Sequence, residues 1–347
     1  MSHWFHRNVL KATTQVNFDM AMISSEPSAI KLCSDLKACR RRLLELLPDP
    51  GHTVEAIESV FSMYLALLHG LLFVPGENTP SKLRHNTLFK WTHSLLGNTP
   101  QLQNDAMFEA ANMSCNVAFW FMKHAAMMAA KDDITMEEAK EVHTSLRKAA
   151  GIFKLVESEF GPKLTERQLE GGDLDPRVMS AYLTQCTAEA QEVTMARAME
   201  LKHNPSLISA LANETYKLFS DAARVLEPLG DVTAQWIKYL RLKAAVYQAY
   251  VVVITEEVQN FHLLLEYRPH IDVSLTCEHD PKLQEYCVCP QNQRHYNSIL
   301  DSHRALVCCP KLKPVCACLR RHATGRNRAV NTIVILVLCF VSGVFSE

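Results

Sequence analysis

Residues 134–160 carry the clearest structural pattern of this chain, a single apolar stripe that follows a helix-start signal. Thr135 and Glu138 stand three residues apart, as in a capping box, where each side chain satisfies a free backbone N–H of the first helical turn. Behind them, apolar residues recur at alternating intervals of four and three: Val142, Leu146, Ala149, Phe153, Val156 and Phe160. This spacing gives a helix one narrow apolar face. The segment therefore predicts a long helix that packs against other helices.

Similar periodicity continues through the first 250 residues and predicts further helices. They cover residues 28–47, 54–74, about 101–130, 176–202, 205–225 and about 231–247. Glycine is scarce, with 11 in 347 residues, which suits long helices. Residues 13–18 alternate weakly instead, so we expect a short β-hairpin or an extended arm at the N-terminus. The pattern predicts an all-α fold of antiparallel helix pairs, a solenoid of tetratricopeptide-like hairpins.

Charged residues within these helices set further expectations. Arg40, Arg41 and Arg42 form a run that we expect to lie on a solvated helix face, since buried charges are rare. Glu189 and Glu192 share a helix face, where such carboxylates are solvated or paired with Lys or Arg, unlike the paired acids of a glycosidase cleft. Residues 54–74 are apolar enough to suggest a membrane span, but two glutamates interrupt them, so we expect a core helix.

The composition and the motifs exclude several classes of function. Lys and Arg number 36 and Asp and Glu 37, so a net charge of −1 gives no broad attraction to nucleic acid. No phosphate-binding loop or nucleophile elbow occurs. His143 and His203 lack a second metal ligand at helical spacing, and Cys186 lacks a local basic partner. We therefore expect a binding scaffold that is not an enzyme, with no cofactor and no metal site in these 250 residues.

Three segments of the chain resemble a known family. MSHWFHRNVLKAT at residues 1–13, EAKEVHTSLRKAAGIFK at 138–154 and AEAQEVTMARAMELKH at 188–203 are similar to the Bro-type domain family, which includes Alix. The resemblance runs from residue 1 to about residue 250. It implies a boomerang-shaped helical solenoid that binds the C-terminal amphipathic helix of ESCRT-III subunits, the charged multivesicular body proteins. The guest helix would place its apolar residues in a shallow hydrophobic patch.

The resemblance also implies which residues form this patch. In Alix-like relatives it includes an aromatic residue just after the Gln-Glu-Val run and two aliphatic residues on the next helix. The matching positions here are Thr194, Leu207 and Leu211, so Thr194 departs from the aromatic residue of Alix. Periodicity alone favours another interpretation, in which both leucines face a neighbouring helix as core residues. If the leucines form the patch instead, Ile208 is the core-facing residue.

After about residue 250 the resemblance ends, and we expect the distal helices of a Bro-type domain to be missing. Residues 251–328 form a divergent Cys/His-rich tail that we expect to be poorly ordered. Zinc binding by this tail is an alternative, although its cysteine pairs lack the Cys-x2-Cys spacing of a zinc knuckle. Residues 329–345 carry no charge and follow a group of arginines, so they are a candidate tail anchor at the short limit of a bilayer span. An accidental apolar stretch explains them equally well.

We therefore expect a non-enzymatic adaptor of the ESCRT pathway, for endosomal sorting or nuclear-envelope remodelling. Its expected partners are the C-terminal helices of ESCRT-III subunits, without nucleic acid. Its expected location is cytoplasmic and peripheral to endosomal or nuclear membranes, with membrane contact through residues 329–345 if that segment is an anchor. One alternative is a tail-anchored helical scaffold that does not bind ESCRT-III. A second is the same scaffold with a zinc-binding tail.

Overall fold

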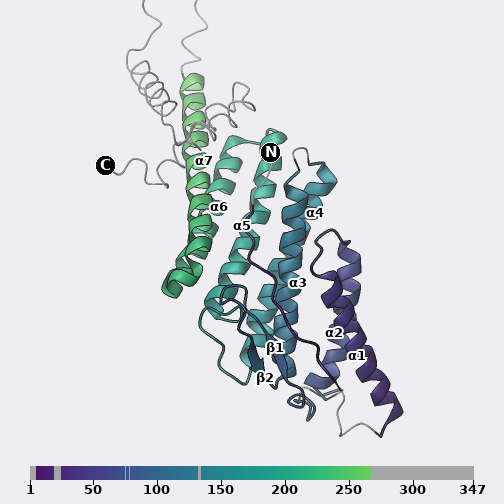
Figure 1. Ribbon diagram of the computed structural model, residues 1–347. Helices are drawn as coiled ribbons and strands as arrows, with labels where there is room; N and C mark the ends of the chain where they lie inside the picture. The colour runs from purple at the N-terminus through teal and green to yellow at the C-terminus, as the bar shows by residue number, and fades with distance from the viewer. Residues whose placement is uncertain (1–4, 19–24, 75, 78, 132–133, 267–347) are drawn as a thin grey trace, which may run out of the picture. The chain divides into compact units, whose positions relative to one another are not determined.

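The computed structural model describes residues 5–18, 25–74, 76–77, 79–131 and 134–266, with side chains described up to residue 254 (Figure 1). The candidate tail anchor at residues 329–345 and most of the predicted tail at residues 251–328 lie outside the described residues. The zinc alternative concerns the cysteines from Cys277 onward, which lie outside them as well. The structure therefore bears on the predicted domain at residues 1–250.

The described part of the chain is mainly α-helical, which confirms the predicted fold class. Its α-helices are α1 (Pro27–Leu46), α2 (Val54–Leu72), α3 (Ala106–Ala129), α4 (Met136–Leu155), α5 (Pro176–Glu200), α6 (Pro205–Leu226) and α7 (Ala234–Glu266). A π-helical turn at Val156–Phe160 and a 3₁₀ turn at Gly161–Lys163 follow α4, and a 3₁₀ segment at Glu227–Thr233 follows α6. α4 packs against both α3 and α5, as Figure 1 shows.

Local capping signals place several helix starts where the sequence predicts them. The capping box of α4 is present: Glu138 N–H donates to Thr135 Oγ1 at 3.2 Å, and Thr135 N–H donates to Glu138 Oε2 at 2.9 Å. The side chain of Asp175 caps α5. Ahead of α6, Asn204 Oδ1 accepts from Ser206 N–H at 2.8 Å. Each cap satisfies a backbone N–H that the first helical turn leaves without a partner.

One predicted helix begins later than expected. The helix predicted from near residue 101 starts at Ala106, because Gln101–Gln103 forms strand β2 instead. β2 pairs antiparallel with strand β1 (Phe89–Trp91). The side chain of Asp105 then caps α3 by accepting from Met107 N–H at 2.8 Å. The pairing of the two strands and this cap together set the boundary.

The N-terminal arm, residues 5–18, is extended, so the chain adopts the second of the two predicted forms and not the hairpin. Within this arm a single β-bridge joins Thr13 to Trp91 of β1. Next to it, Thr92 N–H donates to Ala12 O at 2.9 Å. The arm therefore continues the small sheet on the side of β1, after passing along α3 and α5 (Figure 1).

The apolar stripe of α4 lies in the core, as predicted. Five of its six members are buried: Val142, Leu146, Ala149, Phe153 and Val156. The sixth, Phe160, is half-buried at the end of the π-helical turn. A cluster of mainly small residues joins α4 to α3 and α5, and its buried members are Ala125, Ala129, Ala139, Val142, Leu146, Ala190 and Val193. Alanine at most of these positions lets the three helices approach closely.

The prediction of a solvated arginine run is wrong for Arg40. This side chain is buried, and its Nε donates to Glu109 Oε1 at 2.8 Å. Tyr64 OH and Trp91 Nε1 donate to the same carboxylate, each at 2.7 Å. The next two arginines of the run are exposed, as predicted. Glu109 on α3 thus gathers donors from α1, α2 and β1, because a charge is buried at acceptable cost only when it is paired and hydrogen-bonded.

Helix α2 buries one face only. Its buried residues are Ile57, Tyr64, Leu68, Leu71 and Leu72. Met63, which lies away from this face, is exposed. Among the described residues, α2 is the one helix whose length and composition would allow it to cross a membrane. This is weak support for a span, because apolar helices of soluble proteins pass the same test.

The chain divides into two compact units. Among the described residues, the first comprises the chain up to Lys202 and Glu214–Ala244, and the second comprises His203–Asn213 together with α7 from Ala245. Helices α6 and α7 each contribute residues to both units. Each unit is therefore described by itself. The division of the chain into domains at residues 250 and 328 stays a prediction.

Candidate functional site

Helix α5 carries the first of the predicted patch residues, Thr194, which belongs to the first unit. Between residues 177 and 199 of this helix, Thr194 is the only exposed residue. Its Oγ1 donates to Ala190 O, one helical turn earlier, at 3.2 Å. The hydroxyl proton is therefore used within the helix, and the methyl group is what this side chain can offer to an apolar partner.

Helix α6 carries the other two, Leu207 and Leu211, which belong to the second unit. Leu207 is 48% exposed, and Leu211, one turn further along, is half-buried. Ile208 between them is only 7% exposed. Leu207 is thus a surface residue, which disagrees with the alternative that both leucines are core residues. Binding of a partner by Thr194, Leu207 and Leu211 stays a prediction.

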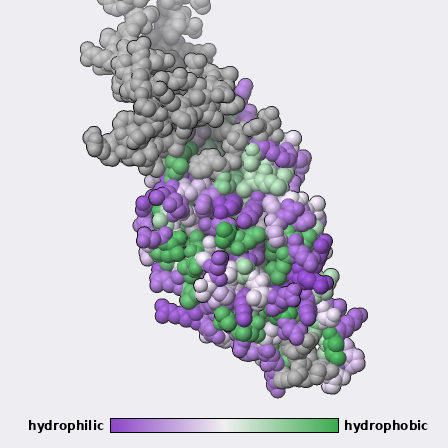
Figure 2. All heavy atoms as spheres, in the orientation of Figure 1, coloured by the Kyte–Doolittle hydropathy of each residue, from purple (hydrophilic) through white to green (hydrophobic). Residues whose placement is uncertain are grey.

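Exposure of one leucine does not by itself mark a binding site. Other large apolar residues are exposed on the described part of the chain, among them Leu169 at 46%. On the face shown in Figure 2, hydrophobic side chains form several separate groups among hydrophilic ones. Isolated exposed apolar residues are normal on soluble proteins. The significance of Leu207 therefore depends on its match to the Bro-type patch and on its neighbour Leu211.

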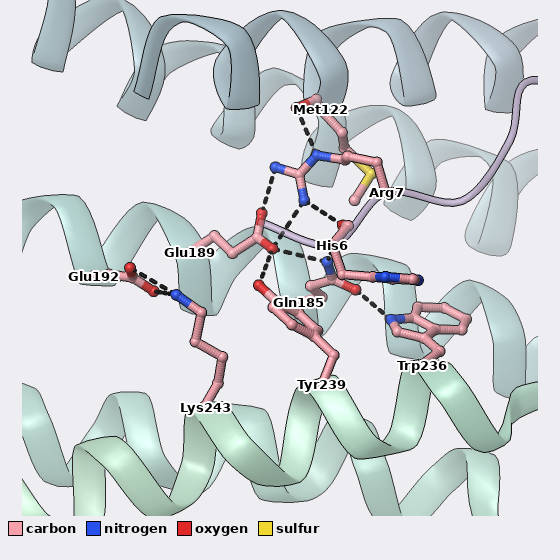
Figure 3. Close-up of polar contacts among 9 residues, drawn as sticks. All are labelled: His6, Arg7, Met122, Gln185, Glu189, Glu192, Trp236, Tyr239 and Lys243. Atoms are coloured by element: carbon pink, nitrogen blue, oxygen red, sulfur yellow. Dashed lines mark hydrogen bonds and ion pairs between the residues drawn. The ribbon is translucent and has the colours of Figure 1, made fainter. Parts of the chain in front are cut away.

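The buried side of α5 is held by a polar network whose partner residues the sequence did not reveal (Figure 3). Glu189 forms a two-pronged pair with Arg7 of the N-terminal arm, with distances of 2.9 Å from Nη1 to Oε1 and 2.8 Å from Nη2 to Oε2. Arg7 Nε also donates to Met122 O of α3 at 2.7 Å. Tyr239 OH of α7 and Gln185 Nε2 donate to Glu189 Oε1 at 2.7 and 2.8 Å. One carboxylate thus links the arm, α3, α5 and α7.

A second buried ion pair lies one turn further along α5 (Figure 3). Lys243 Nζ of α7 donates to both carboxylate oxygens of Glu192, at 2.9 and 2.8 Å. The ring of Phe5 lies near both cations, 4.9 Å from Arg7 Cζ and 5.3 Å from Lys243 Nζ. The two glutamates are therefore paired with Arg and Lys, one of the outcomes expected from the sequence, and they are buried as well.

The charge states in this network follow from its contacts. Burial lowers the pKa of the Arg7 guanidinium, but Glu189 outweighs it and raises the pKa overall, so Arg7 stays a cation. Burial and the neighbouring carboxylates raise the pKa of Tyr239 well above its usual value, so its hydroxyl stays a donor. Burial likewise raises the pKa of the Cys186 thiol, which makes it a poor nucleophile. The arrangement therefore holds α5 with a charged arginine and a protonated tyrosine.

Metal ligands do not gather in the part of the chain that the structure describes. Within those residues, no group of three or more His, Cys, Asp or Glu side chains could hold a metal ion. Burial and the nearby charge of Arg147 lower the pKa of His143, which favours a neutral ring on α4. Among the described cysteines, Cys39, Cys115 and Cys186 are free thiols.

Comparison with known sequences places the chain among BRO1 proteins. The family model described as BRO1-like domain matches residues 20–255. The BRO1 domain-containing proteins BROX of Xenopus tropicalis and Homo sapiens are each 48% identical over 252 residues, and the Caenorhabditis elegans homolog is 38% identical over 262 residues. Each match covers 72% of this chain and 61% of the relative, so the chain spans about 61% of the length of these relatives.

Solved structures show the same fold. ALIX in complex with the SIVmac239 PYKEVTEDL late domain aligns with a TM-score of 0.63 at 17% identity, over 76% of this chain and 38% of that chain. The ALIX BRO1–CHMP4C complex aligns with a TM-score of 0.54 at 18% identity, over 75% of both chains. The sequence resemblance is thus confirmed by the family model, by the relatives and by the fold. The chain belongs to the BRO1-like domain family.

Proposed function

We propose that this protein is a non-enzymatic adaptor of the ESCRT pathway that binds the C-terminal amphipathic helix of ESCRT-III subunits. Membership of the BRO1-like domain family supports the proposal, and so does its likeness to the ALIX BRO1 domain, which has been solved with CHMP4C. The observation that carries it is the exposed aliphatic side chain of Leu207, at the position where Alix-like relatives have an aliphatic patch residue.

The binding mode would be a helix in a shallow groove. Leu207 and Leu211 are four residues apart and offer neighbouring aliphatic surface on α6. Thr194 contributes a methyl group where Alix-like relatives have an aromatic ring. The smaller side chain at this position leaves room for a larger apolar residue of the guest helix. Such an adaptor would work in the cytoplasm at endosomal or nuclear membranes.

The two alternatives depend on residues that the structure does not describe. A tail-anchored scaffold depends on residues 329–345, and a zinc-binding tail depends on cysteines from Cys277 onward. Within the described residues, no observation favours either over the binding of ESCRT-III helices.

The test is binding of a fluorescent peptide, the C-terminal helix of CHMP4C, to the full chain, measured by fluorescence anisotropy. We expect saturable binding by the unaltered protein. Leu207→Asp should abolish it, because removing a carboxylate from water against an apolar helix costs several kcal/mol. Leu169→Asp is the matched control, since Leu169 is also about half exposed but belongs to the first unit, whereas Leu207 belongs to the second.

Circular dichroism of each variant separates binding from folding. Leu207→Asp should keep the helical content of the unaltered protein, because Leu207 is a surface residue. If the unaltered protein is helical but does not bind the peptide, the proposed function is wrong. Equal losses of binding by Leu207→Asp and Leu169→Asp would show that the peptide binds elsewhere.

A further inference from the structure

Helix α5 is held from its buried side by two charged contacts that come from distant parts of the chain. Arg7 of the N-terminal arm pairs with Glu189, and Lys243 of α7 pairs with Glu192. The side chains of both glutamates are 5% exposed or less. All four residues belong to the first unit, as does Thr194. The first unit therefore contains both the contacts that set the position of α5 and Thr194, the residue that α5 presents to solvent.

Thr194 points away from these contacts. Thr194 follows Glu192 by two residues, which is a rotation of about 200° around the helix axis. It follows Glu189 by five residues, which is a full turn and a further rotation of about 140°. Glu189 and Glu192 thus hold the inner side of α5, and Thr194 lies on its outer side. A shift or rotation of α5 at Glu189 is carried directly to Thr194, because less than two helical turns separate them.

Arg7 is especially suited to fix α5 in one position. Its planar guanidinium donates to two oxygens of Glu189 and to Met122 O of α3, so it sets both the distance and the orientation of α5 relative to α3. The family model matches residues 20–255, so Arg7 precedes the matched region, whereas Glu189 and Met122 lie within it.

We propose that Arg7 is a positioning residue for partner binding: its pairing with Glu189 fixes the outer face of α5 that carries Thr194. The inference rests on the proposed function. Arg7 lies on the inner side of α5, so in this role it acts through the position of α5 relative to α3 and not by contact with the partner. Loss of the two-pronged contact is expected to weaken binding of the partner helix about tenfold, the usual size of such indirect effects.

Lys11 supplies a matched control within the same arm. Its Nζ pairs with Asp173 Oδ2 at 2.5 Å, and both side chains are fully buried. Asp173 lies just before the start of α5, whereas Thr194 lies near its other end. Lys11→Met and Arg7→Met therefore each remove one buried cation of the N-terminal arm, but only Arg7→Met releases the part of α5 next to Thr194.

The experiment measures binding of the fluorescent CHMP4C C-terminal helix peptide and the melting temperature of the full chain for both variants. Both should lower the melting temperature, and only Arg7→Met should weaken binding about tenfold at a temperature where each variant is fully folded. Arg7→Lys and Lys11→Arg keep the charge and serve if either methionine variant fails to fold. Arg7→Lys still loses the planar fork, so it should weaken binding while Lys11→Arg does not.

Three outcomes can be told apart. Weaker binding by the Arg7 variants alone supports the positioning role, because a general loss of stability would affect the Lys11 variants in the same way. Equal binding by all four variants, or equal losses, overturns the inference and leaves the proposed function intact. No binding by the unaltered protein overturns the proposed function, and the inference with it.

Discussion

Replacing Arg40 with methionine would leave the carboxylate of Glu109 buried without its cation. The two side chains are 3% and 0% exposed. Tyr64 and Trp91 would still donate hydrogen bonds to the carboxylate, but neither carries a charge. Breaking a buried ion pair by removing one partner costs about 3–5 kcal/mol. Arg40→Met should therefore remove a large share of a folding free energy that is typically about 5–15 kcal/mol.

The neighbouring residue offers a matched control. Arg41 is 72% exposed, and its Nε lies 3.8 Å from Glu45 Oε1. Such exposed pairs contribute about 0–1 kcal/mol to the free energy of unfolding. The melting temperature of Arg41→Met should therefore stay close to that of the unaltered protein. A double variant, Arg40→Met with Glu109→Leu, removes both charges at once. It should be more stable than Arg40→Met alone, because no buried charge is left without a partner.

Thermal unfolding of the full chain, followed by circular dichroism at 222 nm, measures these differences. A loss of about 4 kcal/mol corresponds to a fall in melting temperature on the order of 10 °C for a domain of this size. Equal melting temperatures for Arg40→Met and Arg41→Met would refute the reasoning. A double variant no more stable than Arg40→Met would attribute the loss to the hydrogen bonds from Arg40 to Thr13 and Thr14 instead.

Two further predictions follow from the pKa values of buried groups. Burial raises the pKa of the Asp173 carboxyl, but Lys11 and two hydrogen bonds outweigh it and hold the pKa well below its usual range. Its contribution to stability is therefore present above about pH 4, the value for an unfolded Asp, and is lost as the pH falls further. Thermal unfolding of Asp173→Asn should thus depend less on pH below about 4 than that of the unaltered protein. Burial also raises the pKa of the Cys115 thiol to about 12. Iodoacetamide should therefore leave Cys115 unlabelled in the folded protein and label it once guanidinium unfolds the chain. Peptide mass spectrometry measures the labelling in both states, and equal labelling of Cys115 in the two states would contradict this.

Helix positions were largely predictable because their signals are local. The capping box of Thr135 and Glu138 and the apolar stripe behind it lie within one stretch of 26 residues or so, roughly seven helical turns. The late start of α3 was missed, because strand β2 depends on pairing with β1, and no local pattern reveals that partner. Boundaries set by contacts between distant segments are not readable from local periodicity.

The buried charges were missed for the same reason. Arg40 stands in a run of three arginines, and its partner Glu109 lies 69 residues further along the chain. Arg7 and Glu189 are separated by 182 residues. Either side chain, viewed alone, is best interpreted as a surface charge.

The predicted patch shows a different limit of prediction from sequence. Leu207, Ile208 and Leu211 are all aliphatic, so helical periodicity cannot tell which of them faces the core. The family resemblance suggested the assignment, and the structure places Ile208 inside and Leu207 outside. Function could thus be approached through likeness to relatives, while composition and motifs alone predicted only a helical binding scaffold.

The two ion pairs of α5 have a consequence for how the protein is made. A ribosome releases Arg7 first, Glu189 and Glu192 much later, and Lys243 a further 51 residues after Glu192. At a synthesis rate of about 5–20 residues per second, Lys243 is added roughly 3–10 s after Glu192, and Glu192 has no cation to pair with during that time. The arm, although it emerges first, has no binding site until α3 and α5 exist. Folding of the first unit can therefore be completed only when α7 leaves the ribosome, and until then the nascent chain exposes the apolar surface that this unit later buries.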